Sequence, residues 1–372
     1  MGGRSTLRFP AMLAGLLALA LGLWAGLYRI GWILPVPSLA FPEAHGPLMV
    51  NGVLATLIGL ERAVALERRP FYAAPLLTGL GSVALAAGAP MGPSALLVMI
   101  GSGVLLLAFV VIFRRQGALF TAAQLLGAAA LVAGNFLWWY GWDILYLIPW
   151  WGSFLVLLIA AERLELTRIV PLARSNRLVF AGAVAFAILG CIVSLESFWF
   201  GTLVVAGSWL ALGGWLLLHD VARRNLSRKG LPGFTATCLL AGYAWLVAGS
   251  ALVLFNGGLA PDGFVYDAQL HAVFLGFVLS MVFAHAPVIL PAVLGRSLPF
   301  RRFFYASPIL LNVSVAARIG ADLAGAQTVR EWAGLFNVVA IGLFGISLLA
   351  VLVGSGLDAR HYLRLDSSSF FP

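Results

Sequence analysis

The sequence predicts an all-α polytopic membrane protein. Three observations lead to this fold class: an extreme apolar composition, a regular succession of long apolar runs, and a one-sided distribution of arginines. Of the 372 residues, 62% are hydrophobic and only 10% are charged, and the mean hydropathy is +1.00. So few polar residues cannot cover a soluble globule of this length. We therefore expect a single integral membrane domain over residues 1–372, surrounded by the lipid bilayer.

Apolar runs of about 18 to 25 residues recur along the whole chain, and each could cross a bilayer as a helix. Short links that contain proline or glycine separate them, and these links are too short for a separate soluble domain. The first run is too long for the core of a cleavable signal peptide, so we expect it to be retained. The pattern predicts twelve transmembrane helices, near residues 11–34, 44–66, 71–88, 94–113, 119–139, 144–165, 177–195, 198–218, 234–256, 266–294, 303–322 and 331–354.

The basic residues indicate the orientation of these helices. Of the 23 lysines and arginines, all except Arg29, Arg318 and Arg330 fall at the ends and links on one side of the scheme. The positive-inside rule makes this side the cytoplasm, and twelve crossings place both termini there. The same distribution accounts for the net charge of +9 without a nucleic-acid partner. We expect a multi-pass protein of the bacterial inner membrane.

Two histidines inside predicted helices are the first candidates for a functional site, because a ligand-type side chain in lipid is costly. His45 begins the second helix, and His271 lies near the start of the tenth. Both helices run from outside to inside, so both imidazoles should lie at a similar depth near the outer face. Two facing histidines at one depth suit a haem iron with one imidazole on each side. The alternative is two surface histidines near helix ends.

A haem at this depth would need positive charge beside its propionates. Arg318, Arg29 and Arg330 are the candidates, because they are the basic residues outside the cytoplasmic set. Arg318 lies late in the eleventh helix and reaches about the required depth. Its alternative partner is Asp322, one turn further along the same helix.

His285 is a further candidate metal ligand. It follows His271 by 14 residues in the sequence, so it lies on nearly the same helix face but about 21 Å further along the axis. The two histidines therefore cannot share one metal ion. His285 could relay protons, bind a second centre, or bond a backbone carbonyl loosened by Pro287 and Pro291.

Two similar Glu-Arg pairs end the second and sixth helices: Glu61-Arg62 and Glu162-Arg163. They could form a proton entry, but interlocked ion pairs at the membrane edge are favoured. Their spacing of four helices suggests three related four-helix modules. Cys191 and Cys238 are expected to be core residues. A cluster of tryptophans is best interpreted as an interfacial aromatic belt; its members are Trp138, Trp139, Trp142, Trp150 and Trp151.

Two short motifs carry a resemblance to a known family. HGPLMVNG (His45–Gly52) resembles the second-helix signature of the NnrS family, with His45, Met49 and Gly52 at its positions. HAVFLGFVLSM (His271–Met281) resembles a second NnrS pattern, met by His271, Ala272, Gly276 and Met281. Both motifs also resemble the haem-copper oxidase catalytic subunit, a twelve-helix fold of three four-helix arcs whose low-spin haem ligands come from helices two and ten.

The resemblance implies the three arcs, one haem b between His45 and His271 with Met49 in its binding motif, and a role around nitric oxide or denitrification. The oxidase pattern is incomplete, because Gln269 replaces a histidine and residues 144–195 lack the copper-binding histidines. Pro47 also replaces a second histidine that NnrS-type proteins carry. Copper therefore has no supporting motif, and whether the protein is an enzyme stays open.

Two classes of function remain after these observations. A low-spin haem could transfer electrons from a quinol or a periplasmic donor, or respond to nitric oxide. Alternatively, the chain could be a haem-free transporter or channel, or an assembly factor of a respiratory complex. The pathway residues of a transporter would be Glu61, Glu162, Asp143 and His285. Nothing in the sequence indicates the oligomeric state.

Overall fold

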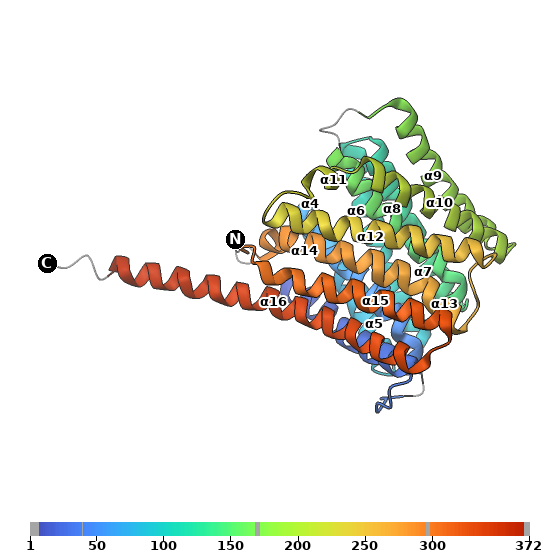
Figure 1. Ribbon diagram of the computed structural model, residues 1–372, viewed down its shortest axis with the longest axis horizontal. Coiled ribbons are helices and arrows are strands. Elements are labelled where there is room, and N and C mark those ends of the chain that lie inside the picture. Colours follow the sequence, from blue (N-terminus) through green and yellow to red (C-terminus); the bar gives the residue numbers. More distant parts are fainter. Residues whose placement is uncertain (1–6, 39, 168–171, 295–297, 368–372) are drawn as a thin grey trace.

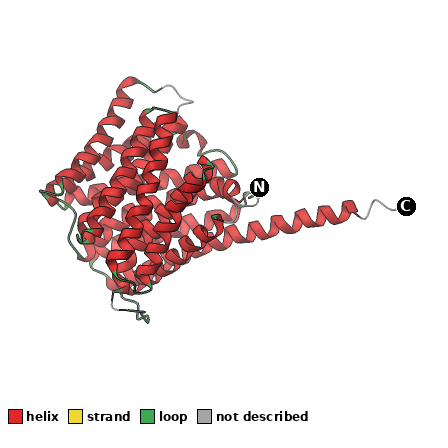
Figure 2. Cartoon of the chain, turned by 180° about the vertical axis from the view of Figure 1, so that it is seen from behind, coloured by secondary structure: helices red, strands yellow, loops and turns green. Residues whose placement is uncertain are grey.

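The computed structural model describes residues 7–38, 40–167, 172–294 and 298–367. Every regular element in these ranges is a helix (Figure 2), which confirms the all-α class. Eleven of the described helices are long and apolar enough to cross a membrane, as expected of a polytopic membrane protein.

Most helices agree closely with the predicted ranges, and two of them combine several helical types (Figure 1). One is continuous over Phe41–Leu66 and contains α3 (His45–Pro47), the π-helical stretch η2 (Leu48–Ala55) and α4 (Thr56–Leu66). The other covers 263–294 and contains α13 (Gly263–His271), the π-helical stretch η5 (Ala272–Phe277) and α14 (Val278–Leu294). The remaining helices are α2 (Arg8–Ile30), α5 (Ala73–Ala86), α6 (Met91–Arg115), α7 (Leu119–Trp139), α8 (Ile144–Leu166), α9 (Arg174–Val193), α10 (Phe198–His219), the short α11 (Ala222–Asn225), α12 (Leu231–Phe255), α15 (Ala306–Ala324) and α16 (Gln327–Ser367).

The helix predicted over residues 71–88 is shorter in the structure. A 3₁₀ turn at Arg69–Tyr72, with Pro70 at its start, precedes α5, and Gly88 follows it with a φ of +93°. The α-helix itself has 14 residues, a length of about 21 Å, whereas the hydrocarbon core of a bilayer is about 30 Å thick. It packs between α2 and α6, although it is not among the eleven candidate spans.

The last helix is longer than predicted. We expected a helix over residues 331–354 and a polar tail, but α16 continues to Ser367. The sequence has no proline between Val353 and Ser367 to end it. Figure 1 shows this extension leaving the bundle at the end where α2 begins, and Figure 2 shows the same arrangement from behind.

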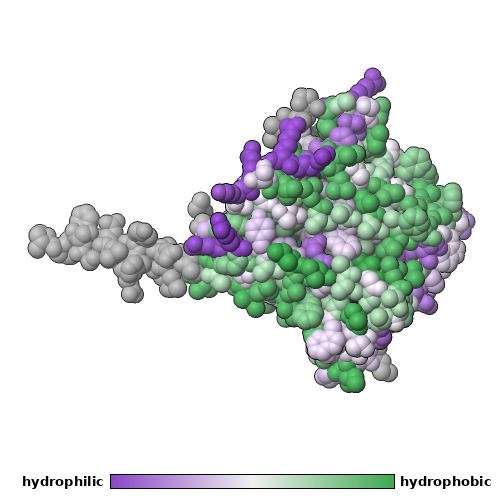
Figure 3. All heavy atoms as spheres, in the orientation of Figure 1, coloured by the Kyte–Doolittle hydropathy of each residue, from purple (hydrophilic) through white to green (hydrophobic). Residues whose placement is uncertain are grey.

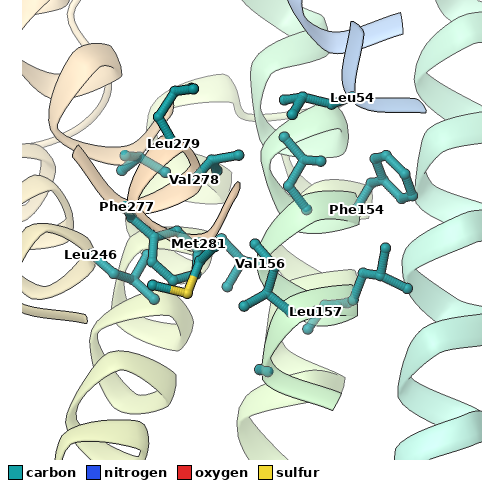
Figure 4. Packing of buried hydrophobic residues seen from close by; sticks show 14 of the residues in the cluster. Leu54, Phe154, Val156, Leu157, Leu246, Phe277, Val278, Leu279 and Met281 are labelled. Atoms are coloured by element: carbon teal, nitrogen blue, oxygen red, sulfur yellow. The ribbon is translucent and has the colours of Figure 1, made fainter. Parts of the chain in front are cut away.

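Three helices form the centre of the bundle: Phe41–Leu66, α8 and 263–294. In their apolar windows, 83% of the residues of α8 and 61% of those of each of the other two are buried, against 56% or less in the other candidate spans. Figure 4 shows how their side chains interlock, with Leu54, Phe154 and Phe277 among the buried residues. In the predicted order these are helices two, six and ten.

The tryptophan cluster corrects one prediction. Trp138, Trp150 and Trp151 are almost fully buried, so they belong to the core rather than to an interfacial belt, while Trp139 is exposed. The packing of α7 against α8 draws them inward. Both cysteines are buried and unpaired, which confirms their prediction as core residues.

Hydrophilic side chains gather on the end of the molecule from which α16 projects (Figure 3). Arg4, Arg168 and Arg296, which contributed to the predicted orientation, lie outside the described residues.

The hairpin of α9 and α10 depends on one glycine. A Cβ atom at Gly201 would lie 2.3 Å from the backbone nitrogen of Ser194, whereas one at Gly207 in the same helix would meet nothing within 4 Å. Gly201→Ala should lower the free energy of unfolding by about 1–3 kcal/mol, because the backbone of Ser194 would have to shift to make room for the added methyl group. Thermal unfolding in detergent measures this, with Gly207→Ala as the matched control. Equal melting temperatures for the two variants would contradict this helix packing.

Candidate functional site

The structure brings His45 and His271 together, although they are far apart in the sequence. Their ring centroids lie 6.3 Å apart, and the ring planes are inclined by 31°. A metal ion bound to one nitrogen of each ring, at about 2 Å from each nitrogen, would place the centroids about 6 Å apart. The observed separation therefore fits two ligands on opposite sides of one metal.

Both imidazoles are held by hydrogen bonds from the same ring nitrogen. Nδ1 of His45 bonds the carbonyl oxygen of Gly22 at 2.8 Å, and Nδ1 of His271 bonds the carbonyl oxygen of Asp267 at 2.9 Å. A carbonyl only accepts, so each Nδ1 carries a proton. In each neutral ring, Nε2 is left with a lone pair, and neither Nε2 has a hydrogen-bond partner among the described residues. Histidine ligands of metals usually have this arrangement.

A π-helical stretch follows each histidine. The helix widens at η2 soon after His45 and at η5 directly after His271. The hydroxyl of Thr56 donates to the carbonyl of Asn51 at 3.1 Å, which supports the backbone as η2 ends. π-Helical turns are rare and occur often at functional sites, because they change the direction of side chains.

Two glycines of α2 make room for His45 and its motif. A Cβ atom at Gly26 would lie 2.8 Å from Cε1 of His45, and one at Gly22 would lie 2.8 Å from the sulfur of Met49. Gly22 thus supplies both the acceptor for His45 and the space for Met49. The helix α2 forms one wall of the site because these positions have no side chain.

Asp267 connects His271 to two arginines. Its carboxylate accepts two hydrogen bonds from Arg318, at 2.8 and 2.9 Å, and lies 3.2 Å from Nδ1 of His271. Arg330 contacts the same carboxylate at 3.4 Å and Asp322 at 2.8 Å. Asp267 is therefore a buried residue of helix α13.

The arginines predicted to face haem propionates have protein partners in the structure. Arg318 pairs with Asp267 rather than with Asp322, the alternative partner considered from the sequence. Arg29 lies 3.6 Å from Glu43 at the exposed edge of the bundle. An additional contact of Arg318 or Arg29 with a propionate stays a prediction.

Buried amides support the second helix beyond His45. The side-chain amide of Asn135 donates to Asn51 at 3.0 Å, and the indole nitrogen of Trp151 donates to Asn135 at 2.9 Å. This chain joins η2 to α7 and α8, and all three residues are buried. It holds the π-helical stretch against the central helix α8.

The other half of the bundle contains two ion pairs between helices. Arg62 bonds Glu162 and lies 3.5 Å from Glu61. Arg163 donates two hydrogen bonds to Asp220, at 2.7 and 2.8 Å, and Tyr243 donates a third at 2.6 Å. Ion pairing is thus present at both positions, with Asp220 as an unforeseen partner; a proton entry stays an untested alternative. Burial alone would raise the pKa of Asp220, but the bonds from Arg163 and Tyr243 lower it below its ordinary value.

His285 lies apart from the histidine pair. Its Nδ1 bonds the carbonyl of Met281 at 2.7 Å, so a bond to the backbone is present, as one of the alternatives from the sequence required. The acceptor is the carbonyl one turn earlier, not one released by a proline. Its Nε2 is buried and unpaired. The described residues contain no group of three or more His, Cys, Asp and Glu that could hold a metal ion, so a second metal at His285 stays a prediction.

Comparison with known proteins identifies the family of this chain. A family model described as a domain of unknown function, DUF8744, matches residues 8–353. The chain belongs to this family. No curated protein and no solved structure matches it. The match covers nearly the whole chain, including both histidines.

Sequence reasoning missed several residues of the site in this DUF8744 chain. Gly22, Gly26 and Asp267 all contact the histidine pair or its partners. The four-residue spacing of Gly22 and Gly26 is a signal for close helix packing. Asp267, four residues before His271 on one helix, could likewise have been recognised as its neighbour.

The Asp267–Arg318 pair makes a testable contribution to stability. Asp267→Ala should lower the free energy of unfolding by about 3–5 kcal/mol, because it leaves buried positive charge without its partner. Asp267→Ala combined with Arg318→Met should recover most of this loss, since the unpaired guanidinium is also removed. Chemical unfolding in detergent micelles measures both. A double variant no more stable than the single one would contradict the pairing.

Proposed function

We propose that this protein is a membrane haem protein that binds one low-spin haem b between His45 and His271. The observation that carries the proposal is the paired imidazoles, 6.3 Å apart, each with Nδ1 bonded to a carbonyl and Nε2 left as a ligand. Two ligands alone hold a bare metal ion weakly, whereas a porphyrin supplies the remaining four. The donor set therefore fits haem.

The protein's own groups would orient and tune the ligands. Gly22 and Asp267 hold the two rings in the tautomer that binds iron. The Asp267 carboxylate beside Nδ1 would increase the electron donation of His271, while Arg318 balances its charge. A haem held by His45 and His271 would supply one-electron redox chemistry.

Electron transfer is the activity that this coordination favours. A gas such as nitric oxide could bind the iron only if one histidine left, so a response to nitric oxide would be coupled to movement of His45 or His271. The resemblance to NnrS supports a role around nitric oxide or denitrification. A quinol or a periplasmic donor would be the redox partner.

The finer topology belongs to the same proposal. We include α5 as a twelfth crossing. The helix α2 begins at the end of the bundle where α16 leaves it, and a chain that starts and finishes on the same side of a membrane must cross it an even number of times. The central position of the second, sixth and tenth helices supports three four-helix arcs. In the bacterial inner membrane, the basic end with both termini would face the cytoplasm.

Spectroscopy of histidine variants tests the proposal. Protein made with ample haem should show a reduced-minus-oxidised haem spectrum, which His45→Ala and His271→Ala abolish. His219→Ala is the control and should keep it, because His219 stacks on Trp215 instead, with the rings 5.2 Å apart. Folded wild-type protein without a haem signal would contradict the proposal and favour a haem-free transporter, channel or assembly factor.

A glycine substitution tests the placement of His45 without removing it. Gly26→Ala should shift or weaken the haem spectrum, because the added methyl group would collide with the His45 ring. Gly320→Ala adds the same group in α15, where nothing lies within 4 Å, and should leave the spectrum unchanged. Identical spectra for both variants, at equal haem content, would place His45 away from the iron.

A further inference from the structure

A pocket lined by basic residues lies where two links of the chain meet. Arg228 and Lys229 come from the link before α12, and Arg301 and Arg302 come from the link before α15. All four side chains are exposed. Gly230, Phe300 and Tyr305 complete the lining. Links more than 70 residues apart in the sequence thus bring four positive charges around one cavity.

Local structure holds the two links together. Gly230 has a φ of +80°, and a Cβ atom at Gly233 would lie 1.9 Å from the carbonyl oxygen of Arg228. The turn before α12 therefore needs both glycines. The buried ring of Phe234 packs against Phe300 and Tyr305, with centroids 5.6 and 5.3 Å apart. The pocket is a built feature of the fold rather than a chance meeting of loose side chains.

The positive charge in the pocket has no partner in the described part of the chain. No described carboxylate lies within ion-pair distance of these four side chains, whereas Arg62, Arg163, Arg318 and Arg330 all have such a partner. Four like charges around one cavity repel each other, so a bound anion would stabilise the arrangement. Phe303, next to the basic pair, is 48% exposed and offers an apolar surface beside the charges.

We propose that this pocket binds the phosphate headgroup of an anionic phospholipid, with Arg228, Lys229, Arg301 and Arg302 contacting the headgroup and the acyl chains passing over Phe303. Charge complementarity and the adjoining apolar surface favour a lipid over a soluble anion. Basic pockets between membrane helices on the cytoplasmic side are a known mode of headgroup recognition. The site is independent of the haem.

Lipid titration of variants tests this proposal. Purified protein is titrated with phosphatidylglycerol, and bound lipid is counted by native mass spectrometry. Arg301→Gln with Arg302→Gln should weaken binding about ten-fold, because two headgroup contacts are lost. The matched control is Arg223→Gln with Arg224→Gln, which removes the same charge from α11, outside the pocket, and should change binding less than about two-fold.

Further arms separate the possible outcomes. Phosphatidylcholine should not bind measurably to the pocket. Thermal unfolding in detergent checks that every variant melts like the wild type. Equal losses for the two double variants would show only general attraction of lipid to a basic surface and would overturn the proposal. Full displacement of the lipid by millimolar inorganic phosphate would also overturn it, since the pocket would then be a site for a free anion.

Discussion

The structure depends on one constraint: inside lipid, every polar group must find its partner within the protein. Arg318 with Asp267, Arg163 with Asp220, and Arg62 with Glu162 satisfy it by joining helices that are distant in sequence. The amide chain from Trp151 through Asn135 to Asn51 does the same without charge. Against this background, His45 and His271 are distinctive because their fixed rings lie 6.3 Å apart and no described residue bonds either Nε2, whereas the unpaired Nε2 of His285 lies apart from them.

The two ends of the molecule use charge differently. At the histidine end, Asp267 and Asp322 balance Arg318 and Arg330 in a compact network, so the site has little net charge of its own. The basic pocket lies at the end predicted to face the cytoplasm. Its four basic side chains have no carboxylate partner in the described part of the chain: Arg228, Lys229, Arg301 and Arg302. The charge distribution therefore agrees with the two proposals, in which the buried histidine site binds a haem and the basic pocket binds an anionic lipid.

Much of this arrangement could be predicted from the sequence, because hydropathy and proline positions determine where helices lie in a bilayer. The common depth of His45 and His271 followed from helix direction alone, and the structure brings the two rings together. The partner of Arg318 could not be predicted, since Asp322 on the same helix was the nearer choice in sequence and Asp267 is 51 residues away. The burial of Trp138, Trp150 and Trp151 was also missed, because composition does not distinguish a core from a membrane interface. The length of α5 depended on a proline turn whose geometry the sequence leaves open.

The central claim is that His45 and His271 bind one iron between them. Electron paramagnetic resonance of the oxidised protein, grown with ¹⁵N-labelled histidine, tests it most directly. The account predicts low-spin ferric iron with hyperfine coupling to two histidine nitrogens, one of which disappears when either histidine is replaced by methionine. High-spin iron in the wild type, or coupling to two histidine nitrogens that survives either substitution, would contradict it.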